Sequence, residues 1–153
     1  MTLREYLPED IEQILKLFYN TVHMVNAADY SPAQLDAWAP QNQDAAQWNN
    51  SLCINYTLVA EENGEIAGFA DLAADGYFNR LYVRVDFQRR GIASRLASAL
   101  EKKAREQGVK TLIVHASITA RPFFEKRGYT LVKEQQVSRR GVEMINYVMQ
   151  LEL

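Results

Sequence analysis

The spacing of apolar residues in the first third of the chain predicts helices. A short strand is expected at residues 2–6, and Pro8 then gives a helix-start signal. Apolar residues follow at intervals of three and four, as on one face of an amphipathic helix. Ser31-Pro32 and Asp44 are typical of helix N-termini and predict two further short helices. The apolar positions of the first helix are Ile11, Ile14, Leu15, Phe18 and Val22.

From residue 56 the apolar residues alternate with polar ones, which predicts strands. Asn63-Gly64 and Asp75-Gly76 are dipeptides of tight hairpin turns, because such turns need positive φ at their central positions. They predict an antiparallel meander of three strands at residues 56–61, 65–73 and 77–84.

The second half of the chain mixes helices with strands. Apolar residues recur every four positions from Ile92 to Ala104 and predict the clearest helix, which ends at Gly108. We therefore expect an α/β (α+β) fold with a mixed, mostly antiparallel sheet of about six to seven strands flanked by helices. The last expected elements are a strand at residues 111–115, a helix at 118–127 and a hairpin of strands at 129–137 and 142–151.

The length of 153 residues, with 48% hydrophobic and 24% charged residues, predicts a single globular domain over residues 1–153. Charged residues among the first ten positions exclude a secretory signal there, and no apolar run of about 18 residues predicts a membrane span. A cytoplasmic protein is expected. Cys53, His23 and His115 lack the spacing of zinc ligands, so no metal site is expected.

Charge is separated along the chain. Residues 17–79 contain no Lys or Arg, and most of the basic residues lie in residues 80–153. This asymmetry indicates either two partners of opposite charge or charges that pair locally in the fold. In the first case the acidic stretch would form a binding side for a cationic partner. No nucleic-acid-binding motif accompanies the basic half, so no nucleic acid partner is expected.

A basic loop between a strand and the clearest helix carries the most specific signal. A helix N-terminus presents unpaired amides and a partial positive charge, which suits a phosphate group. Gly91 and Ala93 are small enough to let phosphates approach the backbone. The expected phosphate-binding residues are Gln88, Arg89, Arg90, Gly91, Ile92, Ala93 and Ser94.

Two motifs resemble those of the GCN5-related N-acetyltransferase (GNAT) superfamily. Gln88-x-x-Gly91-x-Ala93, after the strand Leu81-Tyr82-Val83, resembles its acetyl-CoA pyrophosphate loop. The segment from Ser117 to Tyr129 resembles its later CoA-contacting helix, with Ser117, Phe123 and Phe124 at contact positions. The resemblance implies a GNAT fold whose sheet splays between the strand ending at Val83 and the one ending at His115, with acetyl-CoA in the gap.

The resemblance also implies roles for individual groups. Backbone groups of Leu81, Tyr82 and Val83 would pair with the pantetheine arm, and the Val83 amide would donate to the thioester carbonyl. Phe124 stands where many relatives have a tyrosine that protonates the departing thiolate, so that role is not carried over. Water, Tyr77 or Tyr82 could supply the proton instead.

Two functions are compatible with these motifs. One is an acetyl-CoA-dependent N-acetyltransferase in which a primary amine, on a small cationic or peptide acceptor, attacks the thioester directly. The other, suggested by Phe124, is a catalytically weak or inactive CoA-binding sensor or interaction protein of the same fold. The exposed final hairpin could pair between subunits, which would make a homodimer.

An attacking amine must lose a proton, so a base is needed. Asp71, on the strand beside the active strand, and His23, at the end of the first helix, are the candidates. Each also has a structural interpretation, as a surface strand residue and a helix-end histidine. His115 and Cys53 are interpreted as buried or packing residues. Strict alternation puts Tyr77, Asn79, Leu81 and Val83 on one face, and Asn26 and Tyr30 are expected beside His23 in the acceptor pocket.

Overall fold

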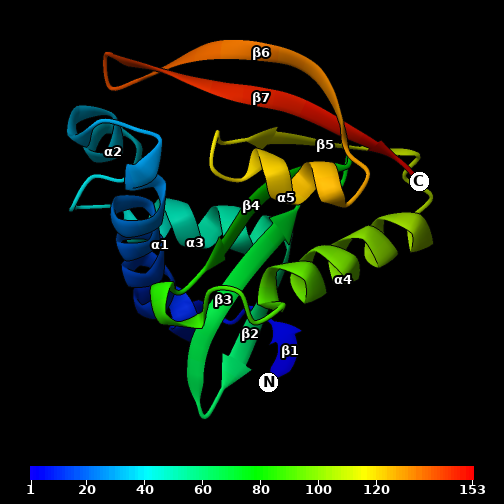
Figure 1. Cartoon of the computed structure of the whole chain (residues 1–153). Helices are drawn as coiled ribbons and strands as arrows, with labels where there is room; N and C mark the ends of the chain where they lie inside the picture. The colour runs from blue at the N-terminus through cyan, green and yellow to red at the C-terminus, as the bar shows by residue number, and fades with distance from the viewer.

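The computed structural model describes residues 1–153, and its strands form one seven-stranded sheet (Figure 1). The strands are β1 (Thr2–Glu5), β2 (Tyr56–Glu62), β3 (Glu65–Leu72), β4 (Tyr77–Val83), β5 (Thr111–Ala116), β6 (Thr130–Arg139) and β7 (Val142–Glu152). Their order is β1-β2-β3-β4-β5-β7-β6. Only β4 and β5 pair in parallel. The predicted mixed, mostly antiparallel sheet is therefore confirmed.

Helices cover the two faces of this sheet in separate groups. They are α1 (Ile11–Val25), α2 (Pro32–Trp38), α3 (Ala45–Ile54), α4 (Ile92–Glu106) and α5 (Arg121–Lys126), with short 3-10 helices at Pro8–Asp10, Asn26–Ala28 and Val85–Phe87. The first three α-helices lie on one face and the last two on the other (Figure 1). None of these helices is both long enough and apolar enough to cross a membrane.

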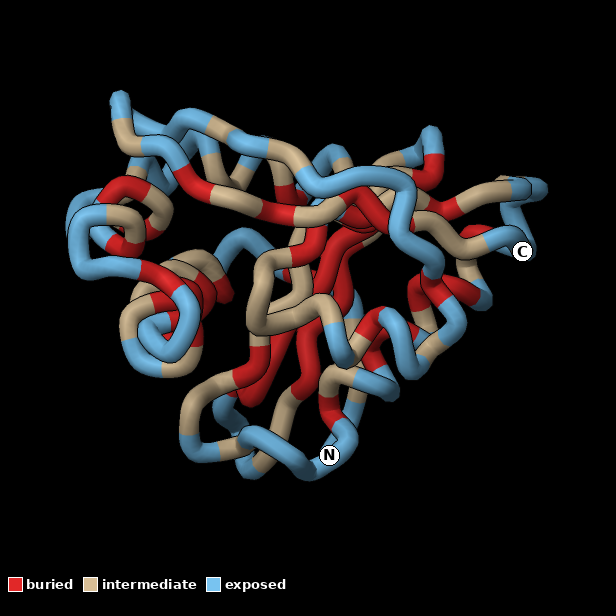
Figure 2. The backbone as a smooth tube through the Cα atoms, turned by 45° about the horizontal axis from the view of Figure 1, so that its top comes forward, coloured by how far each residue is buried: buried red, intermediate tan, exposed pale blue.

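Side chains that alternate along the strands build one core under each helix layer. On β2, Val59 packs in the core with α1, whereas Leu58 and Ala60 pack in the core with α4. Buried residues run through the central strands, and the exposed ones lie mostly on turns and outer surfaces (Figure 2). The central strands therefore form the most deeply buried part of the fold.

The local signals read from the sequence have the expected structures. The Ser31 hydroxyl accepts from the Gln34 amide at 3.2 Å, and the Gln34 side chain accepts from the Ser31 amide at 2.9 Å, which completes a capping box for α2. Asn63 and Gly64 both have positive φ, 54° and 79°. The helix expected at 118–127 is shorter, because the Ser117 hydroxyl accepts from the Ala120 amide and holds a turn before α5.

β4 and β5 separate soon after they start. Their parallel pairing consists of Tyr77 with Ile113 and Phe78 with Val114. β4 then stays paired with β3, and β5 stays paired with β7 along its length. The predicted splay between these two strands is thus confirmed.

A β-bulge lies at the start of this splay. Arg80 pairs with Asp71 and Phe78 pairs with Leu72, so Asn79 is an extra residue on β4. Leu81 and Val83 consequently pack on the same side as Phe78, in the core with α4. The expectation that Tyr77, Asn79, Leu81 and Val83 share one face is wrong, because the bulge interrupts the alternation.

A buried ion pair joins the two helices of the second layer. The Glu101 carboxylate of α4 accepts from Arg127 at 2.6 and 3.2 Å and from the Tyr129 hydroxyl at 2.9 Å. Glu101 is only 6% exposed. Since a buried carboxylate needs a cation and hydrogen-bond donors, this cluster fixes the end of α5 against α4.

We expect Arg127→Met to lower the free energy of unfolding by about 3 kcal/mol, because it leaves the Glu101 carboxylate buried without its cation. Urea denaturation followed by circular dichroism measures this loss. Arg121→Met is a control at the other end of α5, since Arg121 pairs with the more exposed Glu125 at 3.3 Å. The control should lose less than about 1 kcal/mol. Equal losses would contradict the role assigned to the buried pair.

Candidate active site

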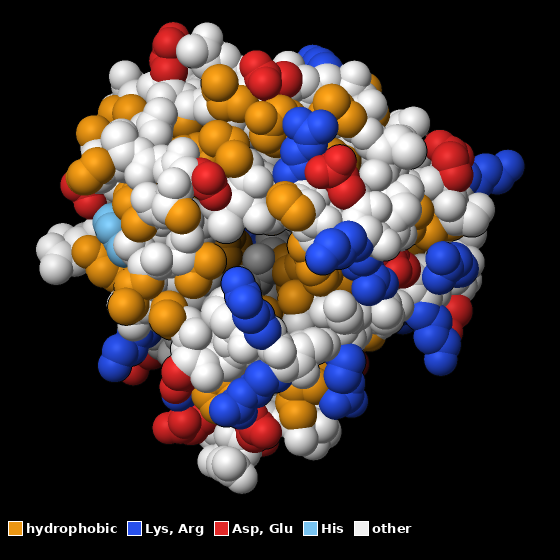
Figure 3. All heavy atoms as spheres, viewed as in Figure 1, with side chains coloured by type: hydrophobic (Ala, Val, Ile, Leu, Met, Phe, Trp, Pro, Cys, Tyr) orange, Lys and Arg blue, Asp and Glu red, His pale blue; other side chains and the backbone are white.

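Two cavities meet where β4 and β5 separate. The first, called here the strand cleft, has a volume of about 230 Å³ and lies between these strands and α5. The second, called the aromatic pocket, has a volume of about 370 Å³ and lies between α1–α3, β4 and the β6–β7 hairpin. Figure 3 shows a hollow with apolar side chains around it and Lys or Arg side chains beside it. Both cavities are lined by Trp38, Asn79, Arg80, Tyr82, His115 and Ser117.

The strand cleft contains the predicted backbone site. Leu81, Tyr82 and Val83 line it. The Arg84 amide donates to Ala67 of β3 at 2.8 Å, so strand alternation turns the Val83 amide the other way, toward the gap. The Val83 carbonyl accepts from the Gln88 side chain at 2.6 Å and from Thr21 at 3.0 Å. Internal donors therefore satisfy this carbonyl.

The loop before α4 has the geometry of an anion-binding turn. Arg89 and Gly91 have φ of 62° and 78°, and Gly91 is the N-cap of α4. A Cβ built on Gly91 meets nothing within 4 Å, so the space in front of the loop is open. This fits a phosphate held by backbone amides at a helix N-terminus.

The residues of this loop divide into three groups. Gln88 and Ala93 line the strand cleft. Ile92 is buried in the core with α4 and anchors the first helical turn. Arg89, Arg90, Gly91 and Ser94 are exposed outside the cleft.

The expected CoA-contacting residues after β5 also face the cleft. Ser117, Phe123 and Phe124 all line it. The Phe124 ring is 2% exposed and packs edge-on against Phe78 and Tyr129, at 5.6 and 5.0 Å between ring centroids. It is a wall of the cleft and has no proton to donate.

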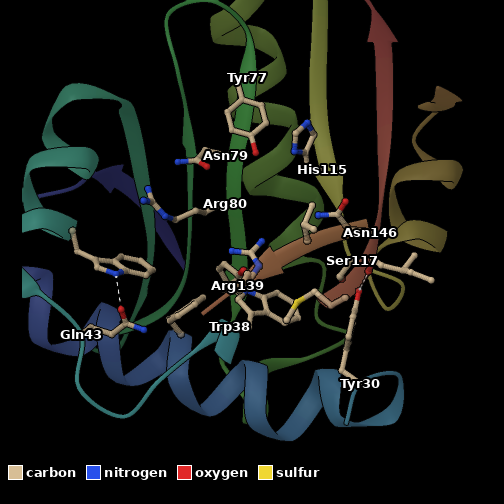
Figure 4. Close-up of a pocket in the computed structure, with 16 residues that line it drawn as sticks. Tyr30, Trp38, Gln43, Tyr77, Asn79, Arg80, His115, Ser117, Arg139 and Asn146 are labelled. Atoms are coloured by element: carbon tan, nitrogen blue, oxygen red, sulfur yellow. Dashed lines mark hydrogen bonds between the residues drawn. The ribbon is translucent and has the colours of Figure 1, made fainter. Parts of the chain in front are cut away.

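The acceptor residues predicted on the other side are partly brought together. Tyr77, Asn79 and Tyr30 line the aromatic pocket (Figure 4), and Asn26 lines the cleft. The Tyr30 hydroxyl donates to the Ile145 carbonyl at 2.8 Å and accepts from the Ile118 amide at 2.9 Å. Tyr30 thus joins the β7 strand to the loop after β5.

Neither predicted base lines the strand cleft or the aromatic pocket. The His23 ring donates from Nε2 to the Ala39 carbonyl at 2.8 Å and stacks on Tyr19. Asp71 is fully buried, and one of its oxygens accepts from Asn55, Asn79 and Arg80. Burial raises the pKa of Asp71, and the Arg80 charge opposes this. Asp71 therefore lies behind the pocket wall and holds Arg80 in place.

His115, unlike His23 and Asp71, has its side chain at the junction of the two cavities. It is exposed, lines both cavities, and lies edge-on to Tyr77 at 5.1 Å between ring centroids. Desolvation lowers its pKa, and the charges of Lys133 and Arg139 lower it further. The interpretation of His115 as a buried strand residue is wrong, because Leu112, Val114 and Ala116 are the buried residues of β5. This alternation is the sequence signal that could have found it.

The aromatic pocket is not acidic. Its charged lining residues are Arg80 and Arg139, and no carboxylate lines it. The acidic side chains of residues 17–79 lie elsewhere: Glu61 pairs with Arg4, and Glu65 pairs with Arg84. The aromatic pocket therefore lacks the acidic lining expected of an acceptor side, and Glu61 and Glu65 follow the alternative of local charge pairing.

Comparisons with known proteins find relatives over nearly the whole chain. A family model described as "Acetyltransferase (GNAT) domain" matches residues 26–151. The Escherichia coli (strain K12) protein "Uncharacterized N-acetyltransferase YafP" is 37% identical over 147 residues, which are 96% of this chain and 93% of that protein.

Two solved structures have the same architecture. A Rhodopseudomonas palustris protein described as "GCN5-Related N-acetyltransferase: Aminotransferase, Class-II" has a TM-score of 0.96 at 37% identity, over 99% of this chain and 95% of that chain. The PaiA N-acetyltransferase from Thermoplasma acidophilum, in complex with coenzyme A, has a TM-score of 0.83 at 17% identity, over 99% and 98% of the two chains. The resemblance drawn from the motifs is confirmed, and the chain belongs to the GNAT family of acetyltransferases.

Proposed function

We propose that this acetyltransferase moves the acetyl group of acetyl-CoA to the primary amine of a small acceptor by direct attack. The observation that carries the proposal is the junction of two cavities, one at the expected CoA motifs and one at the opposite side of β4. The PaiA enzyme, which shares the fold, was solved with coenzyme A. A junction of this kind holds donor and acceptor together, which can recover about 7–11 kcal/mol of the barrier.

The donor side fits coenzyme A. The open space before Gly91 suits the pyrophosphate, and the unpaired edge of β4 suits the amide-rich pantetheine arm, which can pair like an added strand. Bound acetyl-CoA supplies an activated thioester carbonyl. The Val83 amide, which is turned to the gap, would stabilise the negative charge on that oxygen by about 2.7–4 kcal/mol.

Proton transfers need a base and an acid at the junction. His115 is neutral at pH 7 because its pKa is lowered, so it can take the proton of the attacking nitrogen as the C–N bond forms. The C–S bond then breaks, and the thiolate is protonated. Burial raises the pKa of Tyr82 to about 12, so its hydroxyl keeps its proton at neutral pH and is a candidate donor in place of Phe124.

The homodimer expected from the final hairpin stays a prediction.

Acetyl transfer itself is tested with a panel of primary amines. We expect release of the CoA thiol and formation of N-acetyl product in equal amounts for at least one amine. Mass spectrometry of the product and a thiol assay measure both. Acetyl-CoA binding in calorimetry without thiol release on any acceptor would instead favour the sensor function.

Gly91→Val should weaken CoA binding at least about tenfold, because its side chain fills the space proposed for the phosphates. Gly64→Val is a matched control. Gly64 and Gly91 have φ of +79° and +78°, and a Cβ on either meets nothing within 4 Å. The backbone strain is thus the same, but Gly64 lies in the β2–β3 turn. Calorimetry that found equal CoA affinity in both variants would contradict the proposed phosphate loop.

His115→Gln should lower kcat/KM by about 100-fold or more at pH 7–8, as expected for loss of a general base. Dividing the wild-type kcat/KM by that of the variant at each pH removes the effect of acceptor ionisation, because this effect is the same for both enzymes. Because the pKa of His115 is lowered, this ratio should fall only as the pH drops below about 6.5, where the imidazole gains a proton. His23→Gln, away from both cavities, should keep the wild-type profile. A ratio near one at all pH values would exclude His115 as the base.

A further inference from the structure

The two arginines of the aromatic pocket differ in how their charges are balanced. Arg80 pairs with Asp71 at 2.5 Å, donates to Ser51 at 3.0 Å, and lies over the Trp48 ring at 4.6 Å. Its charge is therefore offset from behind the pocket. Arg139, at the end of β6, forms no salt bridge; its guanidinium carbon is 5.9 Å from the centroid of the Trp38 ring. Arg139 is thus the unbalanced cation of this pocket.

The surroundings of Arg139 contain no carboxylate that could neutralise it. Besides Arg80, the pocket wall around it consists of aromatic rings, aliphatic side chains and the polar groups of Gln43, Asn79, His115, Ser117 and Asn146 (Figure 4). Arg140, the next residue, donates to the Ala37 carbonyl at 2.6 Å and is not part of the lining. A cation that is exposed to a cavity and unpaired is suited to an anionic group of a ligand.

A second polar group in the pocket also lacks a partner. Asn146, on β7, lines the cavity and is 7% exposed, and its Oδ1 is buried without a hydrogen-bond partner. This oxygen is itself buried and so is not exposed to a ligand in the cavity, although Asn146 adds to the polar lining. The unpaired charge of Arg139 is therefore the feature of this pocket that points to a ligand group.

We infer that the acceptor is a small amine that also carries a carboxylate, and that Arg139 determines this specificity by binding the carboxylate. Nine of the 16 lining residues are hydrophobic, so we expect the rest of this ligand to be apolar or aromatic. The inference rests on the proposed role of the aromatic pocket as the acceptor site. It replaces the cationic acceptor expected from the sequence.

The same positive charge would select among amines. A nearby cation that is not paired disfavours a protonated amine. A simple cationic amine would lose affinity through this repulsion. An amine with a carboxylate would regain it through a charge-assisted hydrogen bond to Arg139.

The test compares amines that differ only in the carboxylate. The pairs are phenylalanine with phenethylamine and 4-aminobenzoate with aniline. In one pair at least, we expect the wild type to prefer the acid in kcat/KM, and Arg139→Gln to reduce that preference about tenfold to a hundredfold. Arg139→Lys should retain part of it. Arg140→Gln, the neighbouring residue outside the lining, should leave it unchanged.

A preference for both decarboxylated amines, or a preference for the acid that survives Arg139→Gln, would overturn the inference. If no amine is acetylated, the proposed function fails, and binding decides the inference separately. Calorimetry in the presence of CoA would then compare N-acetylphenylalanine with N-acetylphenethylamine, which have no ionisable amine. Tighter binding of the acid that is lost in Arg139→Gln supports the inference; equal binding, or none, overturns it.

Discussion

The separation of β4 from β5 is the constraint on which the rest of the site depends. After Phe78 the backbone groups of β4 that face β5 have no strand partner, and such groups need hydrogen bonds when they are buried. The gap persists because each strand is held from its other side, β4 by β3 and β5 by β7. The gap therefore leaves a preformed strand edge on β4, and an extended ligand that contains amide groups can pair with this edge. The coenzyme motifs imply such an arrangement.

The bulge at Asn79 links this edge to the aromatic pocket. By adding one residue to β4, it lets Leu81 and Val83 pack toward α4 while Tyr77, Arg80 and Tyr82 line the aromatic pocket. Asp71 lies opposite the bulge and binds Asn79 and Arg80 with one oxygen, while its other oxygen has no partner. A buried charge of this kind fixes the side chains that it contacts. Asp71 therefore orients Asn79 and Arg80 without lining the pocket itself.

The electrostatic character of the pocket arises from pairing and not from the charge of any stretch of sequence. Carboxylates of the acidic stretch are used in surface pairs, helix caps and the Asp71–Arg80 pair. The β6–β7 hairpin, distant in sequence, then adds Arg139 to the cavity. The result is a pocket whose unbalanced charge is positive, next to His115, whose pKa is lowered by desolvation and by nearby cations.

The sequence by itself determined the elements, the family and the coenzyme side, because these depend on local rules: apolar periodicity, caps such as Ser31, turns such as Asn63-Gly64, and a glycine before a helix. Only the tertiary structure decided the lining of the aromatic pocket, which is the proposed acceptor side. Asp71 is on the strand next to β4 and His23 is at the end of the first helix, but the contacts of both turn them away from these cavities. His115, Arg139 and Asn146 instead converge from β5, β6 and β7. Such convergence depends on one bulge and on the pairing of strands far apart in the chain, and no local pattern of residues encodes it.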